Sequence, residues 1–113
     1  MERQEELAAM SEFVRVMAAT DLPSGKPVEV RVGDLALALV KIDGVVHALG
    51  NACAHQGGPL GRGYLDGHTI VCPIHAWAFD VRNGECLDSP EARVPRHEAR
   101  IEDGQILVRI ARS

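Results

Sequence analysis

The sequence of 113 residues is poor in cysteine and aromatic residues and contains no long apolar segment. Its three cysteines are an odd number and too few for a scaffold stabilised by disulfides. The longest nearly continuous apolar run, Leu35 to Val40, is far shorter than the roughly 20 residues of a membrane-spanning helix. The net charge of −4 argues against nucleic-acid binding, for which a basic surplus is typical. What remains is one globular domain, because a hydrophobic fraction of 46% at this length supports a single core but not two.

The first twelve residues differ from the rest of the chain, because they hold four glutamates, one arginine and few residues with high β propensity. We interpret residues 1–12 as a helical or disordered leader and residues 13–113 as the folded domain. A partner-docking arm is the alternative interpretation of the leader. This acidic start lacks the apolar centre of an export signal, so we expect a cytoplasmic protein without a membrane partner.

From residue 13 onward, short runs of β-branched and aliphatic residues alternate with turn residues, a pattern typical of strands. The runs lie at residues 13–17, 28–32, 35–42, 45–49, 100–103 and 105–110. Three dipeptides, Asp43-Gly44, Asn83-Gly84 and Asp103-Gly104, accept positive φ at both positions and therefore predict two-residue hairpins. The spacing predicts an all-β fold, a small antiparallel sandwich or barrel.

The middle of the chain interrupts this pattern, because six of the eleven glycines lie between residues 50 and 67. A structureless loop of that length is uncommon inside a compact domain unless it has a function. We therefore expect something other than hydrophobic packing to hold this segment in place.

Two short motifs supply candidate metal ligands, Cys53-Ala54-His55 and Cys72-Pro73-Ile74-His75. A site of thiolates and imidazoles favours zinc, copper or an iron–sulfur cluster. Structural zinc sites usually pair two cysteines from one segment with two histidines from another, whereas here each segment contributes one of each. The mixed pattern suits a two-iron cluster in which two cysteines hold one iron and two histidines hold the other. A zinc-stabilised interaction module remains the alternative.

The stretch from Cys53 to Pro90 resembles the cluster-binding segment of Rieske-type ferredoxins, the carriers of aromatic-ring dioxygenase systems, which are related to nitrite reductase small subunits. The resemblance implies a Rieske fold, in which an antiparallel β-sandwich or barrel base carries an inserted cluster-binding subdomain at about residues 50–90. It also implies one 2Fe-2S cluster per chain with Cys2His2 ligation. The implied ligands are Cys53, His55, Cys72 and His75. This chain departs from the family at Ala54, a frequent proline, and at Ala76, where glycine commonly precedes the tryptophan.

The function implied by the resemblance is that of a one-electron carrier that is not an enzyme on its own. A flavin-dependent NAD(P)H reductase would reduce it, and a terminal oxygenase would oxidise it. A Rieske small subunit of a nitrite reductase-like complex is the alternative. High-potential relatives link their two cluster loops by a disulfide, whereas the matching positions here hold Gly58 and Ile74. We therefore expect a reduction potential at the low end of the roughly −150 to +300 mV of Rieske centres.

Further residues are expected to surround the cluster without binding iron: Gln56, Gly58, Pro59, Pro73, Ala76 and Trp77. Glycines 57, 58, 61 and 63 are expected to adopt unusual φ/ψ values, to allow close approach and to turn backbone N–H groups toward sulfur. Trp77 and Phe79, two residues apart on an expected strand, would share one face and shield the cluster.

The remaining cysteine and histidines have simpler interpretations. Cys86 has no motif partner, so we expect a small buried hydrophobic residue. His47, His68 and His97 lack the spacing of metal ligands, and we expect them at surface or strand positions.

Overall fold

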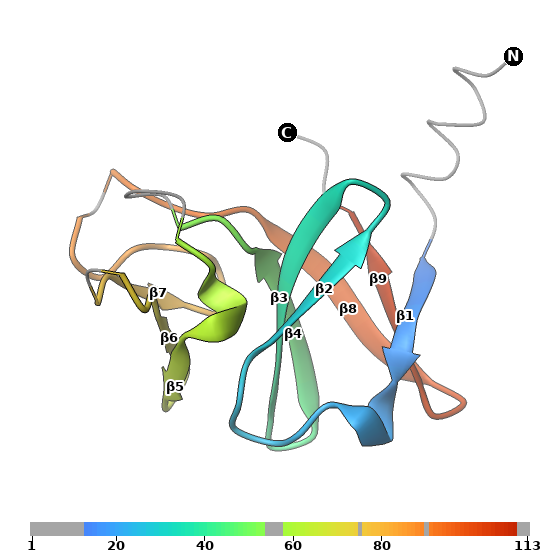
Figure 1. Ribbon diagram of the computed structural model, residues 1–113. Coiled ribbons are helices and arrows are strands. Elements are labelled where there is room, and N and C mark those ends of the chain that lie inside the picture. The colour runs from blue at the N-terminus through green and yellow to red at the C-terminus, as the bar shows by residue number, and fades with distance from the viewer. Residues whose placement is uncertain (1–12, 54–57, 75, 90, 111–113) are drawn as a thin grey trace, which may run out of the picture.

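The computed structural model describes residues 13–53, 58–74, 76–89 and 91–110, which form two antiparallel sheets (Figure 1). The larger sheet has the order β1-β9-β8-β4-β3-β2. Its strands are β1 (Val14–Ala18), β2 (Val28–Val32), β3 (Leu35–Ile42), β4 (Val45–Gly50), β8 (Arg96–Glu102) and β9 (Gln105–Arg109). Its edge strands β1 and β2 contact each other, so the sheet nearly closes into a barrel. The prediction of an all-β antiparallel fold is confirmed.

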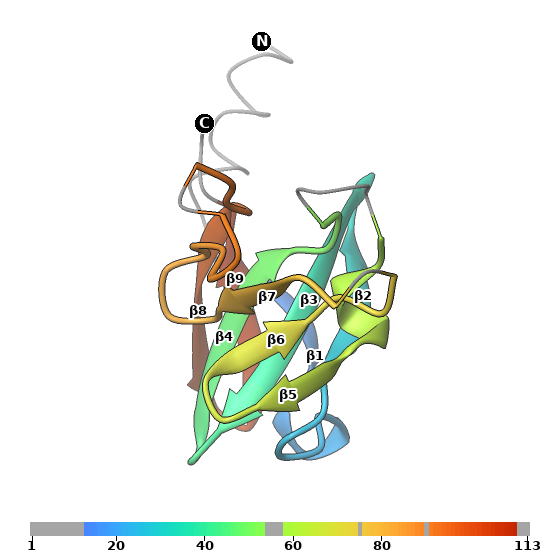
Figure 2. The ribbon, with the colours of Figure 1, turned by 90° about the vertical axis from the view of Figure 1, so that its left-hand side faces the viewer.

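The smaller sheet is built entirely from the segment inserted between β4 and β8, in the order β5-β6-β7. Its strands are β5 (Tyr64–Asp66), β6 (Thr69–Val71) and β7 (Ala78–Asp80). Two short 3-10 helices, η1 (Ala19–Asp21) and η2 (Leu60–Arg62), complete the described elements. The small sheet lies beside β3 and β4, as the two perpendicular views show (Figures 1 and 2). No helix among the described residues is long and apolar enough to cross a membrane.

Two of the three predicted two-residue hairpins are confirmed. At Asp43-Gly44 the φ values are +52° and +79°, and at Asp103-Gly104 they are +51° and +74°. The flanking residues pair as hairpin neighbours, joining β3 to β4 and β8 to β9. Both turns therefore have the backbone twist that matches the flanking strands.

The hairpin predicted at Asn83-Gly84 is wrong, because only Gly84 has a positive φ. The turn is closed instead by the Gly84 N–H, which donates to the Asp80 carbonyl at 2.7 Å. A Cβ atom at position 84 would lie 2.2 Å from the carbonyl oxygen of Val94. Glycine therefore permits the close passage of two backbone segments here, in addition to the positive φ.

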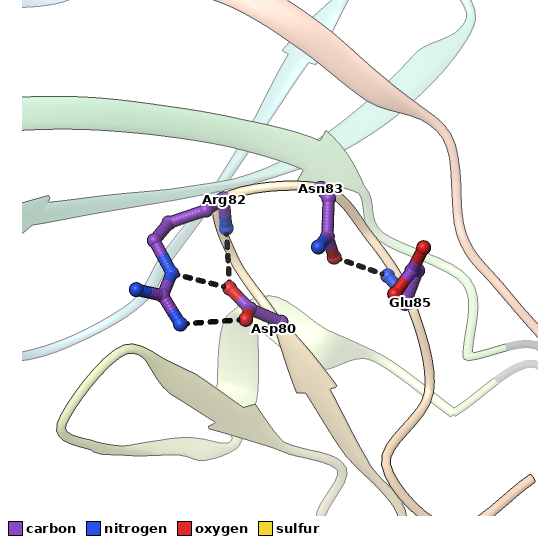
Figure 3. A network of polar contacts seen from close by, with 4 residues as sticks. All are labelled: Asp80, Arg82, Asn83 and Glu85. Atoms are coloured by element: carbon purple, nitrogen blue, oxygen red, sulfur yellow. Dashed lines mark hydrogen bonds and ion pairs between the residues drawn. The ribbon is translucent and has the colours of Figure 1, made fainter. Parts of the chain in front are cut away.

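Ionic contacts fix the turn that follows β7 (Figure 3). The Arg82 guanidinium donates to both carboxylate oxygens of Asp80, at 3.0 and 2.8 Å, and the Arg82 N–H donates to the same carboxylate. These contacts hold the pKa of Asp80 below its ordinary value. The side-chain carbonyl of Asn83 accepts the N–H of Glu85 at 2.9 Å. The chain is thereby turned back so that the segment at Cys86 pairs with Phe79 of β7.

Among the described residues, the buried apolar side chains form two clusters, one inside the large sheet and one between the two sheets. We call the second cluster the inter-sheet core. Its members are Ala38, Val40, Leu49, Cys53, Leu60, Ile70, Cys72, Phe79, Val81, Cys86 and Val94. All three cysteines of the sequence belong to it, and Cys86 is 5% exposed. The prediction that Cys86 is a small buried hydrophobic residue is confirmed.

The histidines outside the two motifs lie on strands or at the surface, as predicted. His47 on β4 makes an edge-to-face contact with exposed His68 in the β5–β6 turn, with ring centroids 6.4 Å apart. This contact connects the two sheets. His97 on β8 is 3% exposed, and its burial lowers its pKa from the ordinary value of 6.5.

The burial of His97 predicts a loss of stability on the acid side. Because its pKa is lower in the folded chain, the unfolded chain binds more protons once the pH falls below about 6.5, and the free energy of unfolding decreases. The His97→Leu variant lacks this titrating group. As the pH falls from about 7.5 to about 5.5, we therefore expect the free energy of unfolding of the variant to rise relative to that of the wild type. Urea unfolding followed by far-ultraviolet circular dichroism measures this difference. A difference that stays constant with pH would contradict the prediction.

Candidate metal centre

The first cysteine loop leaves β4 and is held at its base by three hydrogen bonds, two of which form a β-bridge. The Cys53 N–H donates to the Gly58 carbonyl at 2.8 Å, and Ala52 forms a β-bridge with Pro59. The carbonyl of buried Asn51 accepts the Leu60 N–H, and its side-chain oxygen accepts the Gly61 N–H at 2.7 Å. Sequence reasoning missed Asn51, which carries no ligand signature. The Asn51 side chain accepts a backbone N–H just after β4 ends, where no neighbouring strand of the described chain does so, and it thereby holds the two ends of the loop together.

The second cysteine loop connects β6 to β7 in a tight turn. The Cys72 N–H donates to the Trp77 carbonyl at 2.8 Å, and the Ala76 N–H donates to the Cys72 carbonyl at 3.1 Å. Pro73 and Ile74 lie at the exposed outside of this turn. Cys72 is thus fixed directly after β6, whose Ile70 belongs, like Cys72 itself, to the inter-sheet core.

Both cysteines point into the molecule, since Cys53 is 4% and Cys72 is 3% exposed. Phe79 belongs to the inter-sheet core, as both cysteines do, and the half-buried Trp77 packs against this core. Both aromatic side chains therefore lie in or against the core that contains the cysteines, and their shielding of a cluster stays a prediction. The expected strand position of Trp77 is wrong, because Trp77 lies one residue before β7 begins. Two buried thiols on neighbouring loops, lined by apolar side chains, fit the donor chemistry of an iron–sulfur cluster.

Three of the predicted site residues, His55, Gln56 and His75, lie outside the described residues, as do Ala54 and Gly57. Within the described ranges, no group of three or more histidine, cysteine, aspartate or glutamate side chains is placed to hold a metal ion. The structure therefore brings together the two cysteines of the predicted ligand set, and the two histidines remain a prediction. Among the described residues, Gly58, Ala76 and Trp77 share backbone hydrogen bonds with the two cysteines. That these residues, together with Pro59 and Pro73, surround a cluster stays a prediction.

The glycines of the inserted segment allow close approach, but Gly58, Gly61 and Gly63 lack the positive φ that favours glycine. Gly63 does have an unusual pair of backbone angles, with φ at −82° and ψ at −147°. A Cβ atom would lie 2.8 Å from the backbone of Glu29 at position 61, and 1.9 Å from the Val71 carbonyl oxygen at position 63. The N–H groups of Gly61 and Gly63 donate to protein oxygens, so they do not turn toward sulfur as predicted. These two glycines instead allow helix η2 to pack against β2 and β6.

Ala76 has a left-handed backbone, with φ at +59°. The sequence showed only that alanine replaces a common glycine here, and the structure shows that the methyl group stands on a strained backbone. The strain is maintained by the two hydrogen bonds that close the turn.

Replacing Ala76 with glycine should raise the free energy of unfolding by about 1 kcal/mol, because glycine adopts a left-handed φ without steric cost. Denaturant unfolding measures the change. The matched control is Ala52→Gly in the first loop, which is also exposed but lacks positive φ. There glycine should destabilise the protein. Equal effects in the two loops would contradict the role of the strained backbone.

The fold and the site together define a class of protein. It is a small antiparallel β domain with an inserted three-stranded sheet and two buried cysteines, one on the loop after β4 and one on the loop after β6. The sequence matches the Rieske 2Fe-2S domain over residues 12–103. The chain belongs to this family.

Named relatives agree with this membership. The ferredoxin component of the naphthalene 1,2-dioxygenase/salicylate 5-hydroxylase systems of Ralstonia is 31% identical over 80% of this chain and 88% of its own length. A chain in the complex of reduced oxygenase and oxidised ferredoxin in carbazole 1,9a-dioxygenase is 33% identical, with a TM-score of 0.77, over 84% of this chain and 99% of that one. A protein described as a putative NADH-dependent nitrite reductase small subunit from Mycobacterium tuberculosis is 33% identical, with a TM-score of 0.81, over 89% of this chain and 97% of that one. The predicted family and fold are confirmed.

Proposed function

We propose that this chain is a one-electron carrier whose 2Fe-2S cluster is held by Cys53, His55, Cys72 and His75. The observation that carries the proposal is the pair of buried cysteines on two adjacent, hydrogen-bonded loops of a Rieske domain. The cluster supplies a centre that accepts and releases a single electron. The protein itself orients the ligands, covers their inner side with Trp77 and Phe79, and excludes water from the sulfur atoms.

Mixed ligation makes reduction easier than in an all-cysteine site. Two ferric ions, two sulfides and two thiolates give a neutral oxidised centre, whereas four thiolates would leave two negative charges. Adding an electron to a neutral centre costs less electrostatic energy than adding one to a dianion. We place the potential at the low end of the Rieske range, because Gly58 and Ile74 stand at the positions of the disulfide of high-potential relatives.

The proposed partners are a flavin-dependent NAD(P)H reductase, which reduces the carrier, and a terminal oxygenase, which oxidises it, both in the cytoplasm. Support comes from the relatives, which are named ferredoxin components of dioxygenase systems, and from the neighbour that occurs in a complex with an oxygenase. In this arrangement the chain carries out no substrate chemistry itself. Residues 1–12 remain a proposed leader, and the family match over residues 12–103 overlaps it at residue 12 alone.

A second candidate is a fixed small subunit of a nitrite reductase-like complex, favoured by the structural likeness to such a subunit. The two candidates differ in their association with other chains. A carrier purifies alone and exchanges between partners, whereas a subunit co-purifies with a larger chain at a fixed ratio.

Electron paramagnetic resonance of the reduced protein tests the proposal, because its spectrum separates mixed-ligand from all-cysteine clusters. Metal and sulfide analysis should accompany it and should give equal amounts of iron and acid-labile sulfide. One zinc per chain without sulfide would overturn the cluster assignment and support a zinc-stabilised interaction module.

A further inference from the structure

We propose that Ile74 is a positioning residue that clasps the two cysteine loops together and covers the sulfur of Cys72. This inference rests on the proposed function, because it concerns how the same site retains its cluster. The clasp is a contact between apolar atoms, and it lies where no covalent bond joins the loops.

The contact is visible in the surroundings of Gly58 in the first loop. A Cβ atom added to Gly58 would lie 2.5 Å from Cγ1 and 3.4 Å from Cβ of Ile74, and 2.8 Å from Sγ of Cys72. The bare glycine backbone is therefore in contact with both the isoleucine side chain and the sulfur. Gly58 also accepts the N–H of Cys53 at 2.8 Å. One glycine thus touches Ile74, Cys72 and Cys53, and it connects the two loops.

Ile74 is suited to hold this contact, although half of it faces solvent. Its exposed fraction is 50%, and its covered part includes the side that faces Gly58. A β-branched side chain has few rotamers, so Cγ1 stays over Gly58 at a small entropic cost. Any side chain at position 58 would push the loops apart, because the 2.5 and 2.8 Å approaches are shorter than normal contacts.

The clasp should affect both the lifetime and the potential of the cluster. Separating the loops would admit water and chelators to the Cys72 sulfur, which is otherwise buried. Solvent exposure and hydrogen bonds to sulfur tune iron–sulfur potentials, and both stabilise the more negative reduced state. A smaller or polar residue at position 74 should therefore shorten the cluster lifetime and shift the potential upward.

The test uses the full-length, cluster-loaded protein, with cluster loss to an iron chelator followed by visible absorption and the midpoint potential measured by redox titration. We expect Ile74→Ala to lose its cluster about fivefold faster than the wild type, and Ile74→Ser to show a positive shift of potential. Ile74→Val keeps the branched Cβ, so it should retain most of the wild-type lifetime. Gly58→Ala should accelerate cluster loss from the opposite side of the contact.

Ile101→Ala is the matched control, because Ile101 is an isoleucine with a similar exposed fraction, 42%, on β8 of the large sheet. It should leave both cluster lifetime and potential unchanged. The clasp is overturned when Ile74→Ala matches the wild type, when Ile101→Ala is equally affected, or when Gly58→Ala has no effect. A wild-type protein that purifies without a 2Fe-2S spectrum would overturn the proposed function itself, together with the clasp.

Discussion

Replacing Cys72 with alanine should abolish the visible absorption of the cluster and leave the β-sheet content of the domain in place. The change removes one of two buried thiolates, and an iron ion that keeps a single thiolate loses its tetrahedral site. The inter-sheet core keeps ten of its eleven members, so strand pairing should survive. Visible absorption and iron content measure the first effect, and far-ultraviolet circular dichroism measures the second. His75→Ala should give the same loss of absorption.

Cys86→Ala is the control for this experiment. Cys86 is a cysteine of the same core with a similar exposed fraction, 5% against 3% for Cys72, but it belongs to neither loop. The variant should keep its cluster and lose only packing contacts. A spectrum retained by Cys72→Ala, or lost by Cys86→Ala, would count against the assigned ligands.

The strands that the sequence predicted well are those bounded by strong turn signals. The runs at Val28–Val32 and Leu35–Ile42 coincide with β2 and β3, because Gly33-Asp34 and Asp43-Gly44 delimit them. The prediction for β8 began at residue 100, whereas the strand begins at Arg96. The strand begins with three polar or charged residues, which have no apolar alternation to mark them as a strand. They are extended because the first two pair with β4, a contact between segments distant in sequence.

The small sheet could not be predicted in the same way. Each of its strands has three residues, which is too short for alternation to be recognised. These strands exist because Ile70 and Phe79 are buried against residues of β3 and β4. That burial depends on how segments distant in sequence meet.

At the site, the motifs identified the cysteines, but they did not reveal what holds them. The two motifs predicted that Cys53 and Cys72 belong to one site, because each motif supplies one thiolate and one imidazole. The mixed pattern favoured a two-iron cluster over structural zinc. The strained φ of Ala76 and the contact between Gly58 and Ile74 follow from loop geometry, which a pattern of residue types does not encode. The resemblance indicated that the pair of residues 58 and 74 lacks a disulfide, whereas the structure shows that the two residues are in contact.

Replacing Gly63 with alanine should destabilise the domain by roughly 3 kcal/mol, at the upper end of what overpacking usually costs. The added Cβ would lie 1.9 Å from the carbonyl oxygen of Val71. That oxygen belongs to the backbone of β6, which pairs with β5 and β7, so it cannot move aside as a flexible side chain would. Urea unfolding gives the loss of stability, and visible absorption follows the cluster.

Gly67→Ala separates this steric clash from the general effect of removing a glycine. Gly67 lies in the β5–β6 turn of the same sheet with φ at +63°, and a Cβ there meets nothing within 4 Å. Its replacement should cost about 1 kcal/mol, through backbone strain alone. Because Cys72 follows Val71 directly, Gly63→Ala should also shorten the cluster lifetime, and Gly67→Ala should not. Equal losses of stability in the two variants would contradict the steric clash at Gly63. Equal cluster lifetimes would contradict its effect on the second cysteine loop.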